Sequence, residues 1–144
     1  MTNKDQAFIA EFDRLSDQVH SIAIEKGWWN SQEADTLRAY LCQQPDTDLK
    51  DKLQDLVVKM ENRNDGEALA LIHSEVSEAL EALRHGNPPD DKIPAFSGVE
   101  AELADVIIRI MDISKARGWC VANAIVAKIA FNETRSHKHG GKHF

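Results

Sequence analysis

The chain has 144 residues, of which 42% are hydrophobic, and this length fits one domain with a single modest core. Its net charge of −7 argues against a general nucleic-acid-binding surface, which needs a basic face. No apolar run approaches the ~20 residues that a membrane span requires, so we expect no membrane partner. Cys42 and Cys120 are isolated and form no zinc-binding spacing, and without a recognisable signal peptide a reducing cytoplasm is the expected setting.

Helical periodicity along the chain predicts an all-α fold built as one helical bundle. Apolar residues recur at three- and four-residue steps, which is the period of one helix face. Gly27, Pro45 and Gly118 each follow such a segment and are typical of places where a helix ends. The predicted helices cover residues 3–26, 31–43, 47–63, 67–84, 98–117 and 119–135.

The domain organisation that we expect is a single domain over residues 1–144. We interpret residues 31–65 as a helical insertion between the first helix and the two acidic helices that follow. Residues 136–144 are polar and contain two glycines, so they predict a mobile tail.

The helix predicted over residues 67–84 directs a carboxylate toward its own apolar face. At about 100° per residue, Glu75 lies inside the apolar arc and Glu78 lies at its edge. A carboxylate in an apolar stripe is costly unless a cation or a hydrogen-bond donor meets it. Because the two residues are three apart, both side chains can reach a shared point.

The helix predicted over residues 98–117 is apolar on nearly all sides, as a central helix should be. Its charges fall mainly in one wedge, formed by Glu102, Asp105, Arg109 and Asp112. Two facing acidic pairs would give four carboxylates, a hard, oxygen-rich site that suits Mg²⁺ or Mn²⁺ and not zinc. Either pair alone is also typical of a solvated helix face, so the metal site is predicted from their combination.

The last predicted helix carries polar and basic residues on one face. Lys128, Asn132 and Arg135 follow each other at heptad-like steps and could clamp a polyphosphate, with the amide of Asn132 donating between the two cations. A basic helix end also complements the helix dipole, and this second interpretation stays open.

Together these motifs resemble the all-α NTP pyrophosphatases of the MazG-like group, in their short single-domain form. The resemblance rests on Glu75-x-x-Glu78 followed by Glu102-x-x-Asp105 and on the strings around them. Three further segments are similar to the same proteins: Lys26-Gly-Trp-Trp29, Lys128-x-x-x-Asn132-x-x-Arg135 and Lys138-His-Gly-Gly-Lys142. One departure is the segment 31–65, because the short members pass quickly from the tryptophan pair to the first metal helix.

The resemblance implies Mg²⁺-dependent hydrolysis of a (deoxy)nucleoside triphosphate to the monophosphate and pyrophosphate, as house-cleaning of the nucleotide pool. It also implies a four-helix-bundle-type MazG-like fold, with extra helices inserted after the first helix, and a homodimer or homotetramer. The metal, Mg²⁺ or Mn²⁺ in its place, would be held by the catalytic residues Glu75, Glu78, Glu102 and Asp105. The phosphates would be bound by Lys128, Asn132, Arg135, Lys138 and Lys142. The base would lie against Trp28, Trp29 and His20, although either tryptophan could instead be a packing anchor.

Two competing interpretations follow from the same residues. A di-iron carboxylate bundle uses Glu-x-x-His motifs, and no glutamate of this chain has a histidine three residues later. A non-catalytic helical oligomeric interaction module, with solvated acidic faces, is the remaining alternative to an enzyme. Metal-dependent release of pyrophosphate from nucleotides separates this module from the enzyme.

Overall fold

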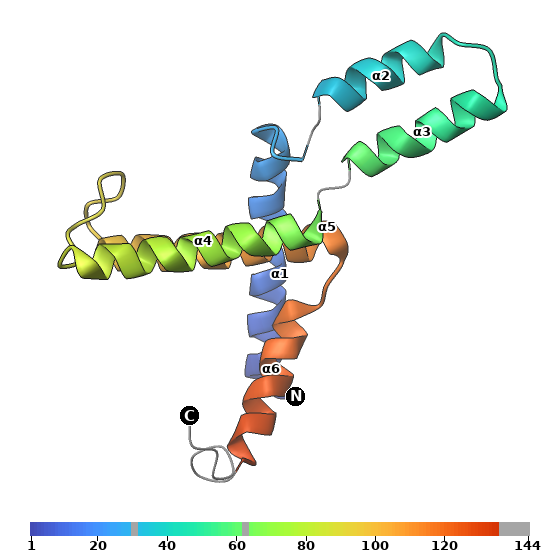
Figure 1. Cartoon of the computed structure of the whole chain (residues 1–144). Coiled ribbons are helices and arrows are strands. Elements are labelled where there is room, and N and C mark those ends of the chain that lie inside the picture. The colour runs from blue at the N-terminus through green and yellow to red at the C-terminus, as the bar shows by residue number, and fades with distance from the viewer. Residues whose placement is uncertain (30–31, 62–63, 136–144) are drawn as a thin grey trace.

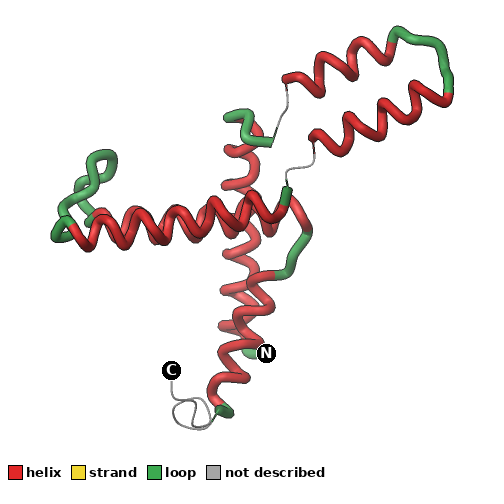
Figure 2. Tube along the Cα trace, in the orientation of Figure 1, coloured by secondary structure: helices red, strands yellow, loops and turns green. Residues whose placement is uncertain are grey.

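The described part of the chain consists of six helices and contains no strand (Figure 2). The computed structural model describes residues 1–29, 32–61 and 64–135. In chain order the helices are α1 (Asn3–Glu25), α2 (Gln32–Cys42), α3 (Asp48–Glu61), α4 (Asp65–Arg84), α5 (Gly98–Arg117) and α6 (Val121–Glu133). The prediction of an all-α fold is therefore confirmed, and no predicted helix boundary differs from the structure by more than two residues.

Local sequence signals explain where the helices begin and end. Thr2 and Ser97 precede α1 and α5, and each forms a capping box with the acidic residue three positions later, Asp5 and Glu100. α5 ends at Gly118, whose φ of 65° is the left-handed conformation that glycine adopts without strain.

α5 is the central helix, as its apolar sequence predicted. It pairs with α4 along its length, while α1 lies across it and α6 runs back beside α1 (Figure 1). Phe12 of α1, Met111 of α5 and Ala122 of α6 form the core cluster where these three helices meet. Within this one chain, α1 and α6 run across the α4–α5 pair and not alongside it. A four-helix bundle therefore remains a prediction.

The connection between α4 and α5 holds these two helices close together. A Cβ atom at Gly98 would lie 3.0 Å from the Cβ of Ala82, so a side chain there would push the helices apart. The side chain of Asn87 accepts a hydrogen bond of 3.0 Å from the backbone N–H of Val99, which fixes the start of α5. These contacts set the register that brings the acidic residues of the two helices opposite each other.

α2 and α3 form a helical hairpin with its own apolar cluster. Ala34, Leu41 and Val57 are buried between the two helices, and the hairpin projects beyond the C-terminal end of α1 (Figure 1). The extra helices predicted for residues 31–65 are thus present. Ser31, with which the second predicted helix begins, and the tail 136–144, predicted to be mobile, lie outside the described residues.

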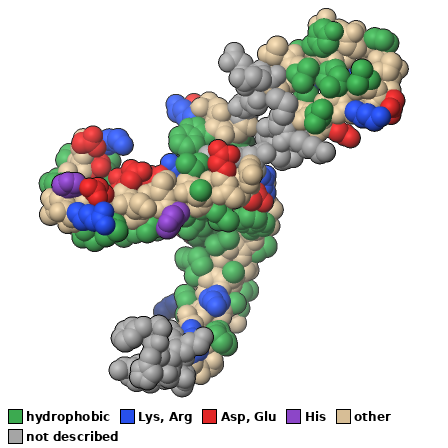
Figure 3. Space-filling view, in the orientation of Figure 1, with side chains coloured by type: hydrophobic (Ala, Val, Ile, Leu, Met, Phe, Trp, Pro, Cys, Tyr) green, Lys and Arg blue, Asp and Glu red, His purple; other side chains and the backbone are tan. Residues whose placement is uncertain are grey.

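An exposed apolar edge runs along one side of the α4–α5 pair. The side chains concerned are between 46% and 56% exposed, and Figure 3 shows hydrophobic side chains gathered along the lower side of this pair. We define the apolar edge as Leu69, Val76, Leu80, Leu83, Leu103 and Ile107. Among the described helices, none combines the length and the hydropathy that crossing a membrane requires.

Candidate metal centre

Three of the four predicted metal ligands converge between α4 and α5. One carboxylate oxygen from each of Glu75, Glu78 and Glu102 lies within 4.8 Å of the other two. Glu75 is only 5% exposed, Glu102 is half-buried and Glu78 is exposed. The burial of Glu75 agrees with its predicted position inside the apolar arc of the helix.

Asp105, the fourth predicted ligand, lies beside this cluster and not within it. The side chain is exposed and lines the pocket that opens next to the three glutamates. Its negative charge still acts on Glu102, one helical turn earlier. Asp105 therefore stands where the carboxylate cluster meets the pocket.

The electrostatics of the cluster favour a bound cation. Burial raises the pKa of Glu102 above its usual range, and the negative charge of Glu78 raises it further. A hydrogen bond with the Glu75 side chain and the negative charges of Glu75 and Asp105 act in the same direction. A cation at this point opposes each of these charge effects because it attracts every carboxylate. Three hard oxygen donors fit Mg²⁺ or Mn²⁺.

Arg109 is the cation that meets the buried Glu75 in the described structure. Its Nε and Nη2 atoms each lie 2.5 Å from Oε1 of Glu75, and the two side chains are 24% and 7% exposed. This pair satisfies the buried carboxylate. The sequence placed Arg109 in the charged wedge but assigned it no role. Its position seven residues after Glu102, on the same helix face, is the signal that could have identified it as a partner of the acidic residues.

An open pocket of about 470 Å³ adjoins Arg109 between α1 and α5. Trp28 is 53% exposed in this pocket, and its ring centroid lies 5.3 Å from Cζ of Arg109. The pocket thus combines an aromatic ring with cations and carboxylates. Its lining consists of Val19, Ile22, Ala23, Lys26, Trp28, Asp105, Ile108, Arg109 and Asp112.

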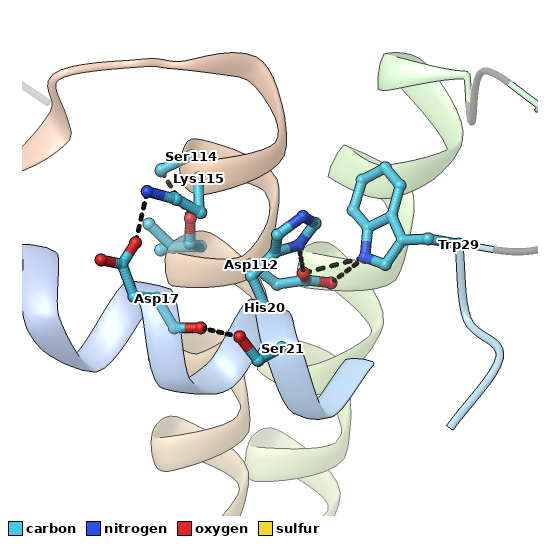
Figure 4. A network of polar contacts seen from close by, with 8 residues as sticks. Asp17, His20, Ser21, Trp29, Asp112, Ser114 and Lys115 are labelled. Carbon is cyan, nitrogen blue, oxygen red and sulfur yellow. Dashed lines mark hydrogen bonds and ion pairs between the residues drawn. The ribbon is translucent and has the colours of Figure 1, made fainter. Parts of the chain in front are cut away.

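Trp29 and His20, the other predicted base contacts, both bind the buried Asp112 (Figure 4). Nε1 of Trp29 donates to Oδ1 and Oδ2 of Asp112 at 2.9 and 3.0 Å, and Nδ1 of His20 lies 2.7 Å from Oδ1. The two rings meet edge to face with centroids 5.3 Å apart. These contacts favour the interpretation of Trp29 as a packing anchor, whereas Trp28 lines the pocket.

Near each of the two tryptophans, an arginine of α5 forms an ion pair with an acidic residue of α4. Nε of Arg117 donates to Oδ1 of Asp65 at 2.6 Å, and its Cζ lies 5.7 Å from the ring centroid of Trp29. Arg109, about two turns earlier on α5, has the same relation to Glu75 and to the first tryptophan. The two arginines therefore form matched pairs, of which only one touches the carboxylate cluster.

The structure places the predicted phosphate-binding residues of α6 away from these carboxylates in the same chain. Lys128 and Asn132 are exposed on α6, and Arg135 lies just beyond its end. α6 runs away from α4 (Figure 1), and its last turns line a groove with the first residues of α1. Lys138 and Lys142 lie outside the described residues.

Comparison of the chain with protein-family models, with curated proteins and with solved structures found no match. The fold and the site define an all-α protein with a carboxylate cluster beside a pocket. The resemblance to MazG-like pyrophosphatases rests on the sequence motifs and supports the proposal that follows.

Proposed function

We propose that this protein is a metal-dependent nucleoside triphosphate pyrophosphohydrolase with a MazG-like fold, acting on the cytoplasmic nucleotide pool. The observation that carries the proposal is the convergence of Glu75, Glu78 and Glu102 beside the pocket of Trp28. Carboxylates recruit a hard divalent cation, and a pocket that offers an aromatic ring and cations suits a nucleotide. The motif resemblance supports the same chemistry.

The three glutamates, with Asp105 next to them, would hold Mg²⁺ or Mn²⁺. The bound metal supplies neutralisation of phosphate charge and activation of a water molecule. Asp105 is exposed at the edge of the pocket, where a carboxylate can orient the attacking water and accept its proton.

The pocket supplies the groups that bind the rest of the nucleotide. Trp28 offers a surface on which a base can stack, and apolar side chains of α1 line the same pocket and can pack against that base. Lys26 lines the same pocket and attracts the phosphates. Bound in this way, a triphosphate has its α-phosphate at the carboxylates and its base against α1.

The hydrolysis products test this proposal. Incubation with ribo-, deoxy- and modified nucleoside triphosphates in the presence of Mg²⁺ should yield a monophosphate and pyrophosphate in equal amounts, because the metal acts at the α-phosphate. Chromatography of the products measures this, and EDTA should stop the reaction. A diphosphate with orthophosphate as the main products would contradict the proposed cut, and no turnover of any nucleotide would favour the interaction module.

The apolar edge predicts self-association into a homodimer or homotetramer. Exposed contiguous apolar surface on two paired helices is typical of an interface. Leu80→Glu together with Ile107→Glu should therefore shift the protein toward the monomer, which light scattering measures. Ser77→Glu, which adds one such charge at an exposed position of α4 outside the apolar edge, is the control and should leave the assembly intact. A wild-type monomer at micromolar concentration would contradict the prediction.

A further inference from the structure

Arg109 stands between the two halves of the candidate site. On one side both of its donors lie 2.5 Å from Oε1 of Glu75, in the carboxylate cluster. On the other side its guanidinium lies 5.3 Å from the ring centroid of Trp28 and lines the pocket. No other cation that lines this pocket also pairs with the cluster in the described part of the chain.

The carboxylate of Glu75 cannot bind Arg109 and a divalent cation at full strength at the same time. Both donors of Arg109 already use one oxygen of Glu75, and a metal drawn to the same carboxylate repels the guanidinium. Metal binding therefore weakens the Arg109–Glu75 pair. A ligand shifts a conformational equilibrium when it binds one state more tightly than the other. Because of this repulsion, the metal binds more tightly when Arg109 has left Glu75 than when the two are paired.

We propose that Arg109 is a substrate-binding residue that changes partners when the metal binds. It holds Glu75 in the metal-free protein and turns toward the pocket, where it binds the phosphates of the nucleotide. A guanidinium is suited to this exchange because its planar donors fit carboxylate and phosphate equally well. This inference rests on the proposed function, because it requires a metal at the cluster and a phosphate chain in the pocket.

The alternative is that Arg109 only holds Glu75 in place. The two roles predict opposite signs for one measurement. If Arg109 competes with the metal, its removal tightens metal binding; if it positions Glu75 as a ligand, its removal weakens metal binding. Arg117 provides the control, because it makes the same kind of pair with Asp65 beside Trp29 but lies outside the cluster.

The experiment compares Arg109→Gln, Arg117→Gln and the wild type by calorimetry. With Mn²⁺ alone, Arg109→Gln should bind the metal at least about fivefold more tightly because a like charge is removed. With inorganic triphosphate and saturating Mn²⁺, the same variant should bind about ten- to a hundredfold more weakly, since a charge-assisted contact is lost. Arg117→Gln should change both affinities less than about twofold.

A second variant keeps the test decisive if Arg109→Gln does not fold. Arg109→Lys retains the charge but not the planar fork, so its Mn²⁺ affinity should match the wild type while its affinity for triphosphate falls. Weaker Mn²⁺ binding by Arg109→Gln, or unchanged triphosphate binding by both variants, would overturn the role of Arg109 alone. Failure of the wild type to bind Mn²⁺ would overturn the proposed function together with it.

Discussion

Glu78→Gln should lose nearly all turnover while the protein remains folded. Glu78 is an exposed member of the carboxylate cluster, so its replacement removes a proposed metal ligand without leaving a buried group unpaired. Replacing a residue that only orients a metal ligand already lowers metal affinity or activity about 10–100-fold. For a ligand itself we therefore expect kcat/KM to fall at least about a hundredfold. Steady-state kinetics at saturating Mg²⁺ measure this loss.

The same variant should lose its thermal response to the metal. Mg²⁺ should raise the Tm of the wild type, because it binds the folded cluster and offsets the repulsion among its carboxylates. The effect should be larger at pH 7 than at pH 4, since the raised pKa of Glu102 favours its protonated form in acid. Glu81→Gln is the control for both turnover and the Tm response. Glu81 lies one turn after Glu78 on α4 and is an exposed partner of Arg84. Equal activity of Glu78→Gln and the wild type would exclude the cluster as the catalytic metal site.

Asp112→Ala should be the most destabilising single change at the joint between α1 and α5. The residue is 8% exposed, and its carboxylate accepts hydrogen bonds from Trp29 while it pairs with His20. Removing one partner of such a buried network leaves the other polar groups unsatisfied, which costs about 3–5 kcal/mol. Denaturant unfolding followed by tryptophan fluorescence measures the loss.

Asp17→Ala provides the matched control for this prediction. Asp17 pairs with Lys115 across the same two helices (Figure 4), but both side chains are about half exposed, at 57% and 49%. An exposed ion pair contributes about 0–1 kcal/mol, so this variant should unfold nearly as the wild type does. Equal losses in the two variants would show that the buried network around Asp112 does not hold the joint.

The amino-acid sequence by itself determined the helices and the faces of the acidic residues. Helix formation depends on neighbours within a few positions, so the capping residue Ser97 and the terminating Gly118 could be interpreted without knowledge of the rest of the chain. The helical period likewise placed Glu75 toward the interior and Glu78 at the margin. The positions of both glutamates depend on the rotation per residue, which is fixed once the helix forms.

Only the tertiary structure decided which side chains meet. Trp29 and His20 lie 83 and 92 residues from Asp112 in the chain, so their contact depends on how α1 crosses α5. The charge wedge contained Arg109 but could not show that it pairs with Glu75, 34 residues earlier, because that requires the register of α4 on α5. Crossing and register are set by the packing of distant side chains, as where Gly98 meets α4, and no local period encodes them.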